Sequence, residues 1–449
     1  MMPENEFPQN VTNTLKLLVI SAHFPPHHLG GYEIRVKNII DELNRRGYEI
    51  LVITTKEDHP KKGLAQGTNY PVIRCLYFNT MNPGLIKRMT TWKYLRQLGL
   101  ILNFMRTLFF DIRDLKRIEY QLIHFRPDVV YLGQILSITK SLLPYLACSK
   151  ANIIVDDGGG TLPYLHDNKG LWINYVEKYE SKFSIINLTK PIINYIVTKL
   201  SGNRIKSRWA WPDNMEVMFK REVNQKTATD KGIPIKNSYV LHSGIDLKQL
   251  VFQSNRIFKS PIKIIYPARI EPKKGQMDAI KLLAKLLENG IEANLFLIGE
   301  LRKSFLPDLR KEIEIHGVEN HLTFVPMVAY AEMPAWYQNA DICFFPSYWK
   351  DGFSRVTLEA MACGSIVISY GNEGSNEIIR SRENGFLVNP EDYVGIVQIV
   401  KELVSNPQVV SKIRLQARRD VEESYSMTPY IDQIEEIIQE TASQKSEQQ

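Results

Sequence analysis

Short apolar runs alternate with amphipathic stretches along most of the chain. Residues 15–21 (LKLLVIS) predict a strand, and a turn that contains Gly30 and Gly31 follows it. From residue 32 to residue 46 the apolar side chains recur with the 3.6-residue period of a helix, and residues 49–54 (EILVIT) predict the next strand. A strand, a helix and a strand in this order form a βαβ unit, which implies a parallel sheet.

The rest of the first half is less regular. Residues 84–125 predict a long, basic, amphipathic helix, and residues 171–200 are rich in aromatic and isoleucine side chains with lysines between them. Further strands are predicted at residues 128–132, 151–155 and 239–243.

In the second half of the chain, predicted strands and helices alternate more regularly. This half predicts helices over 275–288 and from 357, and strands at 262–266, 295–298, 322–325, 342–345 and 366–369. We therefore expect two α/β halves of similar size that join near residues 247–260, and a disordered tail at 441–449.

Composition narrows the class of protein. A length of 449 residues suits two large domains, and 44% hydrophobic with 23% charged residues is typical of globular proteins. Four dispersed cysteines form no CxxC pair, which argues against a zinc knuckle or a disulfide scaffold. The polar N-terminus does not resemble a secretory signal, and no apolar run reaches about 18 residues. We expect a cytoplasmic protein without a transmembrane helix.

Charge is unevenly distributed along the chain. Residues 1–250 hold 34 Lys and Arg against 22 Asp and Glu, net +12, whereas residues 251–449 hold 22 against 27, net −5. The basic half suggests an anionic partner, which could be a phosphorylated ligand, a membrane surface or a nucleic acid. A solvated surface that is simply rich in lysine is the alternative.

Three turns that follow predicted strands could carry chemistry. The Gly30–Gly31 turn precedes a helix N-terminus, which suits a phosphate, although a glycine pair also makes an ordinary tight turn. Arg269 and Lys274 follow a parallel strand at the sheet edge where ligands bind, and two cations there could neutralise a diphosphate. Glu359, in the segment that starts at Asp351, could accept sugar hydroxyls or could be a first-turn helix charge.

Seven segments in order resemble the retaining GT-B-fold glycosyltransferases of family 4, also called glycosyl transferases group 1. They are FPPHHLGG (24–31), LHSGID (241–246), ARIEPKKG (268–275), LIGE (297–300), ADICFFPS (340–347), DGFSRVTLEAMACG (351–364) and NGFLV (384–388). The resemblance is strongest in the second half. It implies an α/β protein with the GT-B fold, in which two Rossmann-like β/α/β domains face a central cleft. The domains would be 1–255 on the acceptor side and 256–425 on the nucleotide-sugar side, with a helix at 426–440 that returns to the N-terminal domain.

The resemblance also implies roles for single residues. Arg269 and Lys274 would bind the donor diphosphate and stabilise the departing nucleoside diphosphate, and Glu359 would bind the ribose. The donor-binding set would be Gly30, Gly31, Arg269, Lys274, Val328, Phe353, Ser354, Arg355 and Glu359. The catalytic set would be Arg269, Lys274, Asp351 and Asp157.

The chain departs from the family pattern at three places. Asp351 stands where the first acid of the E-x7-E motif is Glu, and Ser354 stands where the family usually has Gly. Asp156 and Asp157 follow a predicted strand where the family usually has His. Either carboxylate could act on an acceptor hydroxyl, or the pair could only form an Asp-Gly turn. Their spacing does not fit a DxD metal site, and we expect no essential metal.

The expected activity is retaining transfer of a sugar, a hexose by expectation, from a UDP- or GDP-sugar to a hydroxyl. The acceptor would be a saccharide or a lipid-linked molecule in polysaccharide, lipopolysaccharide or glycolipid synthesis. We expect no cofactor beyond the nucleotide sugar and no nucleic-acid partner. The alternatives are a GT-B nucleotide-sugar epimerase and a catalytically weak donor-binding partner subunit. The basic helix within 85–117 could cover the sheet, or it could make peripheral contact with the inner face of a membrane.

Overall fold

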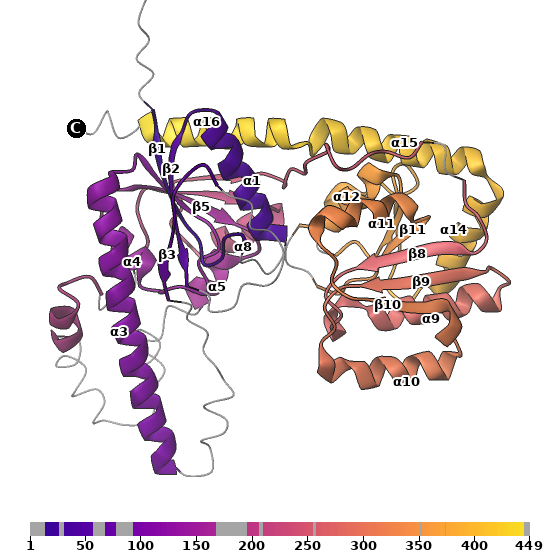
Figure 1. Ribbon diagram of the computed structural model, residues 1–449, viewed down its shortest axis with the longest axis horizontal. Helices are drawn as coiled ribbons and strands as arrows, with labels where there is room; N and C mark the ends of the chain where they lie inside the picture. The colour runs from indigo at the N-terminus through magenta and orange to yellow at the C-terminus, as the bar shows by residue number, and fades with distance from the viewer. Residues whose placement is uncertain are drawn as a thin grey trace, which may run out of the picture.

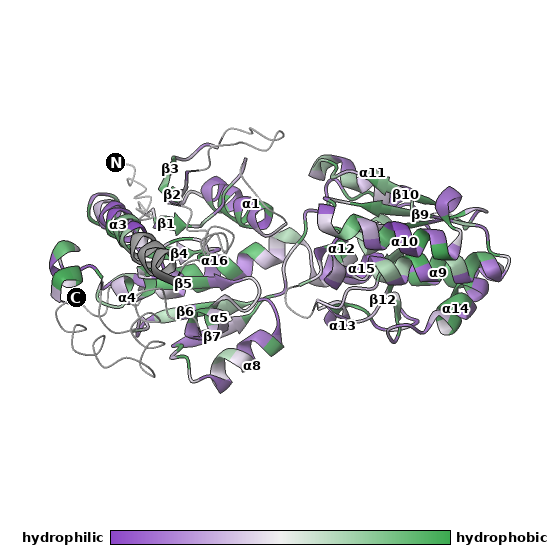
Figure 2. Ribbon diagram, turned by 90° about the horizontal axis from the view of Figure 1, so that it is seen from below, coloured by the Kyte–Doolittle hydropathy of each residue, from purple (hydrophilic) through white to green (hydrophobic). Residues whose placement is uncertain are grey.

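Two parallel sheets with helices on both faces make up the two domains of the protein (Figure 1). The computed structural model describes residues 14–26, 31–56, 68–77, 93–167, 195–205, 210–254, 257–349, 353–372 and 374–443. Figure 2 shows that the strands are largely apolar while the helices carry residues of both kinds. This pattern is expected where helices cover both faces of a sheet.

The N-terminal sheet has the strand order β3-β2-β1-β4-β5-β6-β7, and all neighbours pair in parallel. Its strands are β1 (Lys16–Ile20), β2 (Glu49–Thr55), β3 (Val72–Leu76), β4 (Val129–Leu132), β5 (Asn152–Asp157), β6 (Met215–Phe219) and β7 (Asn237–Val240). The sequence predicted neither β3 nor β6. It also ended β5 at residue 155, whereas the strand continues through Asp156 and Asp157.

Two groups of helices cover the N-terminal sheet. One face packs on α1 (Gly31–Arg45) and α16 (Met427–Ser443), with Ile39 and Ile434 both fully buried. The other face packs on α3 (Lys93–Phe125), α4 (Leu142–Leu146), α5 (Thr161–Asp167) and α8 (Glu222–Asp230). The predicted helix at 84–125 therefore exists from Lys93 onward, and its first nine residues lie outside the described part of the chain.

The C-terminal sheet is also parallel, in the order β10-β9-β8-β11-β12-β13. Its strands are β8 (Ile262–Pro267), β9 (Ala293–Ile298), β10 (Leu322–Val325), β11 (Ile342–Phe345), β12 (Ile366–Ser369) and β13 (Phe386–Leu387). Its α-helices are α9 (Gln276–Glu288), α10 (Leu306–His316), α11 (Met333–Asn339), α12 (Arg355–Cys363), α13 (Ser375–Ile378), α14 (Tyr393–Ser405) and α15 (Pro407–Ser424). Short 3-10 turns lie at Pro272–Lys274 (η1), Lys303–Phe305 (η2), Glu319–His321 (η3) and Tyr330–Glu332 (η4).

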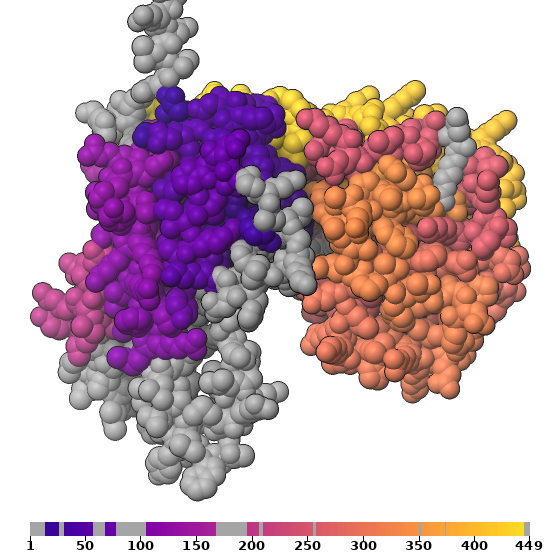
Figure 3. Space-filling view, viewed as in Figure 1, coloured from indigo at the N-terminus to yellow at the C-terminus, as the bar shows by residue number. Residues whose placement is uncertain are grey.

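The C-terminal helices connect the domains along one side of the molecule (Figure 3). α15 packs against the C-terminal domain. After α15, Ser426 forms an isolated parallel β-bridge with Ile245, and α16 then lies on the N-terminal sheet. The prediction that the tail begins at residue 441 was wrong, because α16 continues to Ser443 and Thr441 is buried. No helix in the described residues is both long enough and apolar enough to cross a bilayer.

Candidate donor site between the two sheets

The order of the strands places one ligand-binding crevice in each domain. In a doubly wound sheet, ligands bind outside the carboxyl ends of the strands at the point where the strand order reverses. That point lies between β8 and β11 in the C-terminal sheet and between β1 and β4 in the N-terminal sheet. The loops after β8 and β11 carry Arg269, Lys274 and residues 353–355, and the segment after β1 leads to Gly31. Topology therefore collects most of the predicted site at these two points.

The loop after β8 carries the two predicted phosphate-binding cations. The Arg269 side chain is 64% exposed, and its guanidinium lies 3.2 Å from the Glu271 carboxylate. Lys274 ends the 3-10 turn η1, and its ammonium lies 5.8 Å from the centre of the Trp349 ring. Gly275 has φ = 78°, and a Cβ there would lie 2.0 Å from the Pro346 carbonyl oxygen. Glycine is thus required for the close approach of this loop to the loop after β11.

The loop after β11 leads into α12 and explains one departure from the family pattern. Ser354 is the N-cap of α12, and its hydroxyl accepts a hydrogen bond from the Thr357 N–H. A serine cap satisfies one of the donors that a helix N-terminus leaves unpaired, so serine fits here in its own right. The Phe353 ring before it stacks on the His242 ring, with 4.9 Å between centroids.

Glu359 is held in place by two tyrosines. Its carboxylate accepts hydrogen bonds from the Tyr337 hydroxyl at 2.9 Å and the Tyr330 hydroxyl at 3.2 Å. Burial first, and then the Glu359 charge, raise the pKa of Tyr337 well above its ordinary value. An ionised carboxylate has about four acceptor positions, and the tyrosines leave room for hydroxyls of a ligand.

Arg355 joins the two crevices. Its guanidinium donates to the Gly31 carbonyl oxygen and to the Tyr330 hydroxyl, each at 2.9 Å, and lies 3.5 Å from Glu359. The side chain is 11% exposed. Arg355 was predicted as a donor-binding residue, and in the structure its side chain connects α12 to the start of α1.

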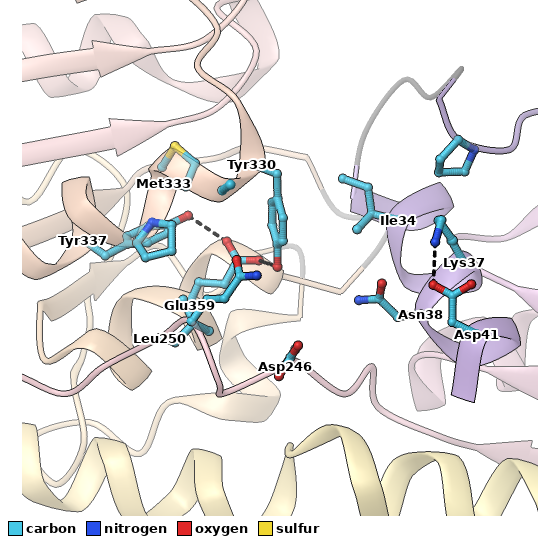
Figure 4. A pocket seen from close by; sticks show the side chains of 14 residues that line it. Ile34, Lys37, Asn38, Asp41, Asp246, Leu250, Tyr330, Met333, Tyr337 and Glu359 are labelled. Atoms are coloured by element: carbon cyan, nitrogen blue, oxygen red, sulfur yellow. Dashed lines mark hydrogen bonds and ion pairs between the residues drawn. The ribbon is translucent and has the colours of Figure 1, made fainter. Parts of the chain in front are cut away.

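A cavity of about 160 Å³ lies beside Glu359, between α1 and the C-terminal domain (Figure 4). Tyr330, Tyr337 and Glu359 lie on one side, and Ile34, Asn38, Asp41 and Lys37 of α1 lie on the other. Neither Arg269 nor Lys274 is among the described residues that line it. The candidate site therefore has two parts, a cationic loop and a carboxylate beside this cavity.

A second cross-domain contact was missed from the sequence. The Glu377 carboxylate of α13 accepts a hydrogen bond from the Arg221 guanidinium at 2.7 Å and lies 3.1 Å from His242 Nε2. Burial alone would raise the pKa of Glu377, but these two partners lower it below its ordinary value. Glu377 follows β12 at the same sheet edge as the other loops, and that position was the signal that could have found it.

Asp157, which was predicted as a catalytic residue, lies at the end of β5 in the turn that leads into α5. Its carboxylate is fully buried and accepts hydrogen bonds from the backbone N–H groups of Gly159, Thr161 and Leu162 at 2.8–3.1 Å. Burial raises the pKa of this carboxyl above its ordinary value, although the N–H donors act in the opposite direction. In this arrangement the Asp157 carboxylate stabilises the turn into α5, and its catalytic role stays a prediction.

Asp156 belongs to a buried network that ties α16 to the N-terminal domain. Its carboxylate lies 2.9 Å from the Arg35 guanidinium and 3.0 Å from the Lys220 ammonium, and it accepts the Tyr131 hydroxyl at 2.6 Å. Arg35 and Lys220 also donate to the Tyr430 hydroxyl of α16. Burial alone would raise the pKa of Asp156, but the two cations lower it to about 2.

Gly30 and Asp351 lie outside the described residues. Val328 is half-buried just before Tyr330 and packs on the core below α12. Within the described ranges, no group of three or more His, Cys, Asp and Glu residues could hold a metal ion.

The fold and site define a class of protein. Two Rossmann-like domains with facing crevices, joined by a returning C-terminal helix, make the GT-B fold, and solved structures confirm this prediction. Sucrose-phosphate synthase from Thermosynechococcus elongatus is similar with a TM-score of 0.66 at 14% identity, over 95% of this chain and 98% of that one. The Anabaena HepE protein in complex with UDP has a TM-score of 0.63 at 18% identity, over 95% and 100%.

Sequence comparison supports a more particular group. Residues 248–420 match the family model described as glycosyl transferases group 1. An uncharacterized glycosyltransferase of Methanocaldococcus jannaschii is 23% identical over 425 residues, which cover 92% of this chain and 95% of that protein. The chain is thus a glycosyltransferase with the GT-B fold, and its residues 248–420 are similar to glycosyl transferases group 1.

Proposed function

We propose that the protein is a retaining family 4 enzyme that transfers a hexose from a nucleoside-diphosphate sugar to a hydroxyl acceptor. The N-terminal part, 1–255, would hold the acceptor and the part from 256 to 425 the donor. One observation carries the proposal. The loop with Arg269 and Lys274 and the helix with Glu359, whose carboxylate is held by two tyrosines, follow β8 and β11, the two strands between which the strand order of the C-terminal sheet reverses. Cations suit a diphosphate, and a buried carboxylate suits the ribose hydroxyls.

In this proposal the two cations stabilise the charge that develops on the departing nucleoside diphosphate, without an essential metal or a further cofactor. UDP is the first nucleotide to test, because the structure of the similar HepE protein was solved in complex with UDP. A saccharide or lipid-linked acceptor would place the enzyme in polysaccharide, lipopolysaccharide or glycolipid synthesis. The net positive charge of the N-terminal half would suit an enzyme that acts in the cytoplasm at the anionic inner face of a membrane.

The testing experiment is thermal unfolding of the full chain with UDP, GDP, ADP and their sugars in the presence of EDTA. A ligand that binds only the folded protein raises the melting temperature. We expect one base to give a selective shift, and Arg269→Ala and Lys274→Ala to reduce it. Lys412→Ala, an exposed cation on α15, is the matched control and should leave the shift unchanged.

Product analysis then separates transfer from its rivals. Sugar joined to an acceptor, with retained anomeric configuration by NMR, supports the proposal. An epimerised nucleotide sugar would instead show an epimerase, and donor binding without any product from an acceptor panel would indicate a binding subunit. If no nucleotide shifts the unfolding of the wild-type protein, the donor-site assignment is wrong.

A further inference from the structure

The outer face of α3 carries an unusual set of exposed side chains. Met105, Phe109, Arg113, Lys116, Tyr120 and Ile123 are spaced by three or four residues, which places them on one stripe of the helix. The apolar members are more than half exposed: Met105 is 52% exposed, Phe109 60%, Tyr120 55% and Ile123 59%. The two cations between them, Arg113 and Lys116, are also exposed. We call these six residues the α3 outer face.

All three acidic side chains in the same part of α3 lie away from this face. Asp111 accepts a hydrogen bond from the Ser141 hydroxyl, and the buried Asp114 accepts one from the Tyr77 N–H at 2.9 Å. Glu119 accepts one from the Arg204 guanidinium at 2.8 Å. Between residues 105 and 125, therefore, the exposed charges are cationic and the acids are buried or paired.

A second segment extends the apolar surface beside α3. Residues 195–200 are helical, and the buried Val197 packs against Leu108 and Leu115 of α3. Tyr195 and Leu200 of this segment are 64% and 59% exposed. Exposed apolar groups thus occur on both of these two packed elements. In both ribbon views, α3 lies on the side of that domain away from the C-terminal domain (Figures 1 and 2).

We propose that the α3 outer face, with residues 195–200, docks on an anionic lipid bilayer. Aromatic and aliphatic side chains enter the region between headgroups and acyl chains, while interleaved Arg and Lys pair with anionic headgroups. A second copy of the chain is a poorer occupant, because a symmetric contact would bring Arg113 and Lys116 of both copies together. The inference rests on the proposed function in one respect, because a lipid-linked acceptor would lie in the same bilayer.

The test is co-sedimentation of the full chain with vesicles of phosphatidylcholine alone and vesicles containing a third of phosphatidylglycerol. We expect binding to the anionic vesicles only, weakened by salt. Each cation near an anionic surface contributes roughly fivefold, so the double variant Arg113→Glu/Lys116→Glu should lose at least about 25-fold. Phe109→Ser/Ile123→Ser should also bind more weakly. Lys412→Glu/Arg419→Glu on α15 is the control with the same change of charge and should bind as the wild type does.

The nucleotide thermal shift, measured on the same variants, separates this inference from the proposed function. An unchanged shift with lost vesicle binding supports docking through α3. Equal binding to neutral and anionic vesicles, no vesicle binding by the wild type, or equal loss in the α15 control would each overturn the proposal. So would self-association in sedimentation velocity that the α3 variants abolish while vesicle binding persists.

Discussion

Replacement of Asp156 by Asn tests the buried network below α16. Asparagine keeps the shape of the side chain but removes the negative charge that Arg35 and Lys220 share. Both cations have side chains that are at most 2% exposed, so water cannot replace the lost partner. Breaking a buried ion pair from one side destabilises a protein by about 3–5 kcal/mol. For a domain of this size we expect the melting temperature to fall by roughly 10 °C.

The pH dependence gives the same prediction an independent readout. The carboxyl pKa is about 2 in the folded protein and about 4 in an unfolded chain, so its contribution is fully present above about pH 4. That contribution is lost as the pH falls from about 4 to 2, because protonated aspartic acid then resembles asparagine. The difference in unfolding free energy between wild type and Asp156→Asn should stay constant from about pH 5 to 8 and shrink in acid.

Asp157→Asn is the neighbouring control. This carboxylate is equally buried but accepts backbone N–H groups instead of pairing with cations, and asparagine keeps one acceptor oxygen for them. The substitution should therefore cost about 1.5–3 kcal/mol, less than Asp156→Asn. Urea unfolding followed by circular dichroism measures both variants. Equal stability of the two variants, or a difference from wild type that does not shrink in acid, would refute the reasoning. A large loss of sugar transfer in Asp157→Asn with unchanged stability would support the predicted catalytic role of Asp157.

Three further changes test the donor site. Glu359→Gln should weaken binding of every nucleoside diphosphate about tenfold or more in calorimetry, since hydrogen bonds to a charged acceptor contribute about 1.5–3 kcal/mol; a loss confined to one base would contradict a ribose role. Gly275→Ala should lower both stability and nucleotide affinity, because its Cβ would meet Pro346. The control Gly290→Ala has a similar φ with open space around it and should cost only about 1–2 kcal/mol, so equal effects would contradict the packing argument. Ser354→Ala should lose about 1 kcal/mol in urea unfolding and Ser354→Gly only a few tenths, and the reverse order would contradict the N-cap role.

The sequence predicted the fold class and the position of the loops that carry Arg269 and Lys274 because both depend on local patterns. Strand β8 is an apolar run followed by cations, and that order alone places Arg269 and Lys274 at a sheet edge. Strand β6 was missed because Glu216 interrupts its apolar pattern. Only the folded protein shows that this buried carboxylate accepts hydrogen bonds from Tyr239 and Asn237 of β7.

Residues far apart in the chain could not be joined from the sequence. Arg221, His242 and Glu377 come from different segments in two domains, and no local spacing relates them. Asp157 was assigned a chemical role because a carboxylate after a strand suits general base catalysis. Its burial depends on the turn that returns three N–H groups to it, which a residue pattern does not show.

The crossing of α16 back to the N-terminal domain affects how the protein folds while it is being synthesised. Ile431, Ile434 and Ile438 complete one face of the N-terminal core, together with residues of α1 and β1. The ribosome makes these isoleucines only after the entire C-terminal domain. Until then this face of the nascent N-terminal sheet lacks the cover of α16, and transiently exposed apolar surface of this kind favours aggregation during synthesis. The two domains therefore mature together, and the N-terminal domain completes its core last although it is translated first.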